Sequence, residues 1–152
     1  MLCLRCVPFF LKWDLPSVQK FGADLGPVIL NLLMVMGADS RNEVTQGCFK
    51  ILAFILYWDT RTDSSKNKEG KHEKLPLTNK QMDALVSLLH SAISDISPHN
   101  SALSLIKSIV SRTYLSPDMY DIMEGVLNLN VQSQVDGVRR VSLILIFSKY
   151  LL

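Results

Sequence analysis

The sequence has few of the residues that mark a disulfide-rich, all-β or strongly charged protein. It has three cysteines, an odd number, so it implies no disulfide framework, and a reducing compartment is the simpler expectation. Glycine (7 residues), proline (6) and aromatic residues (8%) are modest, which disfavours a β-sandwich with its many turns. The net charge of +2 is too small to indicate nucleic acid or membrane binding by bulk charge.

No apolar segment is long enough to predict a membrane span. The longest, Leu25–Met36, is interrupted by Asn31. It is much shorter than a membrane span, which needs about 20 residues. No secretory signal is expected, because Arg5 lies within the first apolar segment. With 48% apolar residues among 152, the chain can build one sizeable core. We therefore expect a soluble, intracellular domain or a part of a larger one.

One segment, residues 59–74, differs from the rest of the chain. It holds 9 of the 30 acidic and basic residues and contains no Val, Ile, Leu, Phe or Met. Because such a segment has nothing to bury, we expect a flexible polar loop, which we delimit as 58–76.

The remainder predicts an all-α fold, because apolar residues recur at steps of three and four. Thr78 and Gln81 form a capping box, and Ser116 precedes a first-turn proline, so both segments begin helices. Pro27 lies inside an expected helix and predicts a kink or break just before it. A strand is arguable only at Val141–Phe147. The expected helices cover 2–11, 16–36, 42–59, 78–97, 100–112, 116–127 and 136–150.

The expected helices pair into a repeat. Pairs begin near Pro16, Thr78 and Pro117. The last two starts are 39 residues apart, and the first two are 62 apart, or about 46 without the polar loop. Because periods near 40–47 with two helices per unit are typical of HEAT and armadillo repeats, we predict an α-solenoid of about three helical pairs. Its parts are a leading half-repeat (1–12), repeats at 15–57, 77–113 and 116–152, and the polar loop.

No cysteine or histidine pattern indicates an active site strongly. Cys3 and Cys6 have CxxC spacing, but a zinc site needs a second ligand pair, and the remaining cysteine is Cys48. We interpret the pair as two helix residues facing different ways and keep a thiol enzyme as a remote alternative. The histidines lack metal-ligand spacing, so we expect no metal and no cofactor: His72, His90 and His99.

Three carboxylates share one side of an expected helix. Asp118, Asp121 and Glu124 stand at i, i+3 and i+6 near its start. Paired carboxylates can perform acid–base chemistry, but acids are also favoured at helix N-termini by the macrodipole. We prefer the second interpretation and expect no enzyme activity.

Basic residues give the candidate interaction site. Lys107 and Arg112 are expected on one helix, and Arg139 and Arg140 open another. Because equivalent helices of a stacked array line one surface, these four residues could form a basic face for RNA or acidic protein. An ordinary solvated face is the alternative. Tyr114 could stack on a base or pack in its turn.

A series of short segments resembles one protein family in a single register. The segments are 11–16 (LKWDLP), 48–50 (CFK), 77–85, 105–112 (LIKSIVSR) and 138–152 (VRRVSLILIFSKYLL). They resemble the C-terminal part of the small-subunit processome component 20 homolog family, whose members are very large HEAT-repeat proteins. The chain is a small fraction of that length, and its last expected helix is less polar than the family's. Because neither end has a polar capping face, we expect a slice of a longer array.

The resemblance implies a scaffold without catalytic residues. The implied role is in processing of the ribosomal RNA precursor within the nucleolus, through contacts with that RNA and other processome proteins. It implies neither a membrane nor a small-molecule substrate. A HEAT/armadillo adaptor of another kind, such as a transport receptor or a regulatory subunit, is the alternative function.

Overall fold

The computed structural model describes residues 2–12, 16–37, 39, 41–63, 77–93, 100–112, 114 and 116–132. These residues form six α-helices and no strand, so the all-α expectation is confirmed for this part of the chain. The helices are α1 (Leu2–Lys12), α2 (Pro16–Met36), α3 (Glu43–Asp63), α4 (Asn79–Ile93), α5 (Asn100–Ser111) and α6 (Pro117–Gln132). The expected helix at 136–150 and the arguable strand within it lie outside the described residues.

Two helix starts follow the expected capping chemistry. The Thr78 backbone N–H donates to Gln81 Oε1 at 2.9 Å, and the Gln81 N–H donates to Thr78 Oγ1 at 3.4 Å, which completes the capping box of α4. At α6, the Met119 N–H donates to Ser116 Oγ at 3.3 Å, and Pro117 is the first helical residue. Local sequence therefore fixes where both helices begin.

The turn from α2 to α3 depends on one glycine and one asparagine. Gly37 has a φ of 78°, and its N–H donates to the Leu33 carbonyl oxygen at 2.9 Å, which ends α2. Asn42 Oδ1 then accepts the Val44 N–H at 2.8 Å and caps α3. The buried Thr45 hydroxyl donates to the Gly37 carbonyl oxygen at 3.5 Å, so the turn is tied to the first turn of α3.

Two helix boundaries differ from the expectation. Of the kink or break predicted just before Pro27, the break is wrong, because α2 continues through Pro27 to Met36. Proline removes one backbone donor, and the buried residues Ile29, Leu30 and Leu33 of the same helix offset that loss by packing in the core. The end predicted at Asp59 is also wrong, since α3 continues to Asp63. Extending an existing helix adds one hydrogen bond per residue and needs no burial. The rest of the expected polar loop lies outside the described residues.

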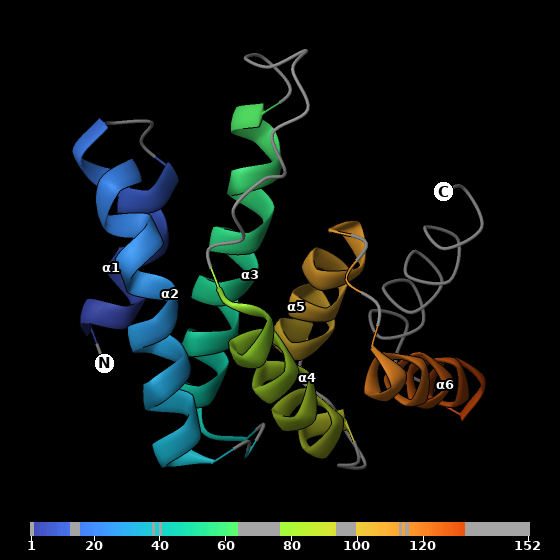
Figure 1. Cartoon of the computed structure of the whole chain (residues 1–152). Helices are drawn as coiled ribbons and strands as arrows, with labels where there is room; N and C mark the ends of the chain where they lie inside the picture. Colours follow the sequence, from blue (N-terminus) through green and yellow to red (C-terminus); the bar gives the residue numbers. More distant parts are fainter. Residues whose placement is uncertain are drawn as a thin grey trace.

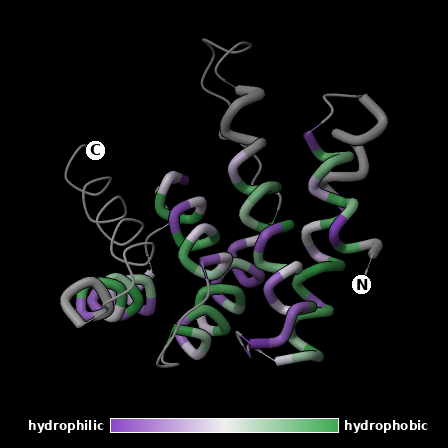
Figure 2. Tube along the Cα trace, turned by 180° about the vertical axis from the view of Figure 1, so that it is seen from behind, coloured by the Kyte–Doolittle hydropathy of each residue, from purple (hydrophilic) through white to green (hydrophobic). Residues whose placement is uncertain are grey.

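The core runs along α3, which packs against α1, α2 and α5. Its inward side chains Phe49, Leu52 and Leu56 are fully buried, and Leu103 and Ile106 of α5 meet the same core. Figure 2 shows hydrophobic and hydrophilic residues alternating along most of the described helices, as expected when each buries one side. None of these helices combines the length and the hydropathy that a bilayer crossing requires.

The helix contacts follow a regular order. Each contact in the described part joins a helix to the next one in the chain or to the one after that: α1 with α2 and α3, α2 with α3 and α4, α3 with α5, and α4 with α5 and α6. Figure 1 shows the consequence, with α1 and α6 at opposite ends of the molecule. The fold is therefore an open row of helices in its described part.

Candidate interaction surface

The structure describes two of the four residues expected on a basic face. Lys107 lies on α5 and is exposed. Arg112 lies in the turn directly after α5 and is half-buried. Arg139 and Arg140 lie outside the described residues, so the joint face of all four stays a prediction.

Arg112 is engaged inside the fold. Its Nε donates a hydrogen bond to the backbone carbonyl oxygen of Leu56 in α3 at 2.8 Å. A charged donor on a part-buried carbonyl is a favourable contact, because it satisfies an acceptor that the core shields from water. Arg112 therefore connects the end of α5 to α3, whereas Lys107 has the exposure that an RNA contact needs.

Tyr114 packs in its turn and joins it to α4. Its ring contacts the core, and its hydroxyl donates to the Asp83 carboxylate and approaches the Asn79 carbonyl oxygen at 3.4 Å. Partial burial, and then the Asp83 hydrogen bond and charge, raise the pKa of Tyr114 to about 12. The packing interpretation fits this geometry better than base stacking.

The cysteines lie in different environments. Cys6 is exposed on α1, and Cys48 is buried in the core on α3, where burial raises the pKa of its thiol. The side chain of Cys3 lies outside the described residues. A raised pKa keeps a thiol protonated and unreactive, so Cys48 has the properties of a core residue.

The other candidate groups that the structure describes are exposed. Asp118, Asp121 and Glu124 are all exposed on α6, and Asp118 lies in its first turn, where the helix dipole favours an acid. His90 is exposed on α4, and His72 and His99 lie outside the described residues. No group of three His, Cys, Asp or Glu residues in the described part could hold a metal ion.

A groove between α1 and α3 is the feature that sequence reasoning missed. It has a volume of about 320 Å³ and is lined by residues of those two helices: Leu4, Arg5, Pro8, Phe9, Glu43, Gln46, Gly47 and Lys50. On α3 the lining positions are spaced by three, one and three residues, so they form one stripe along the helix. The sequence shows this spacing within the expected helix, but no local motif indicated that α1 would lie opposite it.

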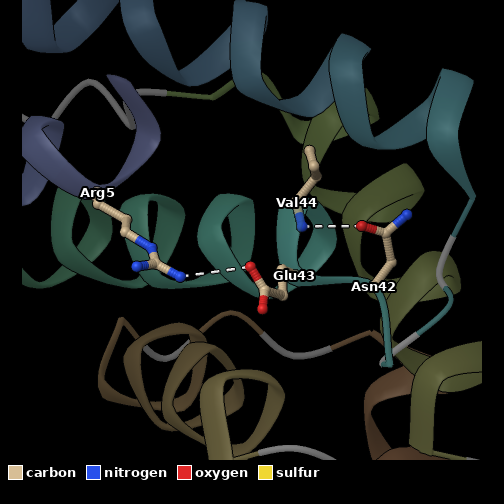
Figure 3. A network of polar contacts seen from close by, with 4 residues as sticks. All are labelled: Arg5, Asn42, Glu43 and Val44. Atoms are coloured by element: carbon tan, nitrogen blue, oxygen red, sulfur yellow. Dashed lines mark hydrogen bonds and ion pairs between the residues drawn. The ribbon is translucent and has the colours of Figure 1, made fainter. Parts of the chain in front are cut away.

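An ion pair crosses the groove. Arg5 Nη2 of α1 lies 3.3 Å from Glu43 Oε2 of α3, and Figure 3 shows the two side chains reaching toward one another beside the Asn42 cap. Their side chains are 73% and 62% exposed, so water screens the pair and it contributes little to stability. Its position on the rim makes it available to a ligand.

The floor and one side of the groove are apolar. A Cβ added at Gly47 would lie 3.6 Å from Leu4 Cβ, so the glycine opens the floor where the two helices approach. Phe9 is 65% exposed on the α1 side, and Lys12 Nζ lies 5.9 Å from its ring centroid. An exposed aromatic beside a mixed rim is typical of protein interaction sites.

Two comparisons with known proteins assign no function to this chain. No protein-family model matches the chain, and no solved structure matches it. The open row of helices and the groove between α1 and α3 are the structural features that bear on function.

Proposed function

We propose that the chain is a non-catalytic scaffold segment built as a HEAT/armadillo-like α-solenoid. The observation that carries this proposal is the order of helix contacts. Helices α2, α4 and α6 contact one another in succession, and so do α1, α3 and α5. Two such rows, joined by contacts between consecutive helices, are what stacked two-helix repeats produce. In this proposal α2–α3 and α4–α5 are repeats, and α6 opens a third.

A scaffold role also agrees with how the side chains are distributed. The row of helices buries one shared core and leaves long faces open to macromolecules. The reactive groups considered above lie apart, with Cys48 in the core and Cys6 on the surface. We therefore propose a surface for partners and no enzyme activity.

We further propose that this scaffold belongs to the small-subunit processome and acts in the nucleolus. The resemblance of the segments 11–16, 48–50, 77–85, 105–112 and 138–152 supports this part of the proposal. The partners would be other processome proteins and the ribosomal RNA precursor, with no membrane and no small-molecule substrate. Exposed Lys107 is the first candidate contact for RNA phosphates, with Arg139 and Arg140 as the other members of the basic face, whereas Arg112 is held against Leu56.

Affinity capture tests the processome role. The tagged full chain is expected to co-purify the small-subunit ribosomal RNA precursor at low salt, and a Lys107→Glu/Arg139→Glu/Arg140→Glu variant is expected to capture less. A variant with the α6 acids replaced by their amides, Asp118→Asn/Asp121→Asn, is the control and should capture at least as much. Absence of the precursor RNA from the wild-type eluate contradicts the processome role.

The alternative, an adaptor that binds protein alone, has its own supporting observation. The groove between α1 and α3 has an apolar floor and a rim of mixed charge, which suits a peptide better than a nucleic acid. An eluate that contains a stoichiometric protein partner and no precursor RNA favours this function.

A further inference from the structure

We infer that the groove between α1 and α3 binds an acidic, extended segment of a partner protein. This inference rests on the proposed scaffold function and names the chemistry of one partner. It is drawn from the shape of the groove, from the charges on its rim, and from the features that disfavour RNA.

The shape of the groove fits a short extended peptide. Glu43 and Lys50 mark its two ends on α3, and seven residues of helix correspond to about 10 Å. An extended chain advances about 3.3 Å per residue, so about three peptide residues span this distance. The apolar floor at Leu4, Pro8 and Gly47 lies between the two ends and suits one apolar side chain.

The charges of the groove select an acidic ligand. Arg5 already faces Glu43 across the rim, at 3.3 Å. Lys50 is exposed at the other end of the stripe, and no described acidic side chain pairs with it. The lining residues thus carry one positive charge more than negative, and it resides on Lys50. A carboxylate of the bound segment complements Lys50, with the neighbouring apolar side chain on the floor.

The same rim disfavours RNA as the occupant. The Glu43 carboxylate is 62% exposed, so it repels the phosphates that RNA would bring along the groove. Lys12 Nζ lies over the ring of Phe9 and competes with base stacking there. A peptide with one apolar residue and a single acidic residue at the Lys50 end brings no negative charge to Glu43 and needs no stacking on Phe9.

Fluorescence anisotropy with the purified full chain tests the inference. The probe is a labelled peptide, Gly-Ser-Ala-Leu-Glu-Ser-Gly, compared with Gly-Ser-Ala-Leu-Lys-Ser-Gly and with a short oligouridine. We expect the glutamate peptide to bind and the lysine peptide to bind at least about fivefold more weakly. Lys50→Glu is expected to weaken glutamate-peptide binding about fivefold to tenfold, because it replaces an attraction with a repulsion. Lys80→Glu, the same change at an exposed position of α4, is the matched control and should leave glutamate-peptide binding unchanged.

A second variant tests the floor independently of charge. Gly47→Leu places its Cβ in ordinary contact with Leu4 and fills the groove beyond it, so it should abolish peptide binding while circular dichroism shows an unchanged helix content. The inference is overturned if the glutamate peptide does not bind, if Lys50→Glu and Lys80→Glu behave alike, or if oligouridine binds and displaces the peptide. These results leave the capture of precursor RNA by the tagged chain as a separate outcome, so failure of the groove and failure of the processome role are distinguishable.

Discussion

Arg112 Nε donates a hydrogen bond at 2.8 Å to the carbonyl oxygen of Leu56, a residue 56 positions earlier in the chain. The bond connects the end of α5 to α3, and these two helices share the most extensive packing in the described part of the molecule. The arginine was expected on a basic surface, and the structure gives it a role in holding two core helices together.

Replacing Arg112 should therefore cost stability. Arg112→Met keeps the aliphatic stem and removes the donor, so we expect a loss of about 1–2 kcal/mol in the free energy of unfolding. Urea denaturation followed by circular dichroism measures it. Lys107→Met, on the exposed side of α5, should change the same quantity by less than about 0.5 kcal/mol. Equal effects of the two substitutions would contradict a structural role for Arg112.

Because of Tyr114, the free energy of unfolding is expected to fall as the pH rises into the alkaline range. Its pKa rises from an ordinary value of 10.0 to about 12 in the folded chain. As the pH passes from about 10 to 12, the unfolded chain loses the phenol proton first, so the folded state loses stability across that window. Below it the neutral phenol contributes fully, and Tyr114→Phe should cost about 1 kcal/mol at pH 7.

The measurement is a set of urea denaturation curves for both proteins between neutral pH and pH 11. The stability advantage of the wild type over Tyr114→Phe should shrink above pH 10. An advantage that stays constant would show that the hydroxyl has no link to Asp83 in solution. Other titrating groups are common to both proteins, so they cancel in the difference.

Two glycine substitutions should shift stability in opposite directions. Gly37→Ala places a side chain at a φ of 78° and is expected to cost about 1 kcal/mol. Gly47→Ala lies within α3, where the new Cβ meets Leu4 at an ordinary 3.6 Å, so the higher helix propensity of alanine should add up to about 1 kcal/mol. Thermal denaturation of the two variants beside the wild type checks both signs. A stabilising Gly37→Ala would mean that the turn after α2 is not left-handed.

Thiol labelling should separate the two described cysteines. In a Cys3→Ser background, Cys6 should react with an alkylating reagent in the native protein, because it is exposed on α1. Cys48 should react only after unfolding, because burial both shields the thiol and raises its pKa. Mass spectrometry counts one label before denaturant and two after it. Two labels on the native protein would mean that α3 is not packed as described.

The features that the sequence predicted correctly are those set by neighbouring residues. The capping box at Thr78 and the proline after Ser116 involve residues within one helical turn, so the starts of α4 and α6 could be inferred directly. The all-α class also followed from spacing alone. The solenoid arrangement, the processome role and the basic face stay predictions.

The features that the sequence did not predict depend on distant contacts or on context. The break at Pro27 did not occur, because core packing of α2 outweighs one missing backbone bond. The contact of Arg112 with Leu56 and the groove that brings Arg5 to Glu43 join segments far apart in the chain. No periodicity or local motif encodes which surfaces of two helices will meet.

The contact order described for the helices has a consequence for how the molecule comes apart. In the described part, α6 packs only against α4, whereas α3 packs against three partners. Opening of α6 therefore leaves the α1–α3 half intact, and native-state hydrogen exchange should report early release of amide protons in α6 and late release in α3. Unfolding of the helix at one end of the described row does not by itself unfold the helices at the other end.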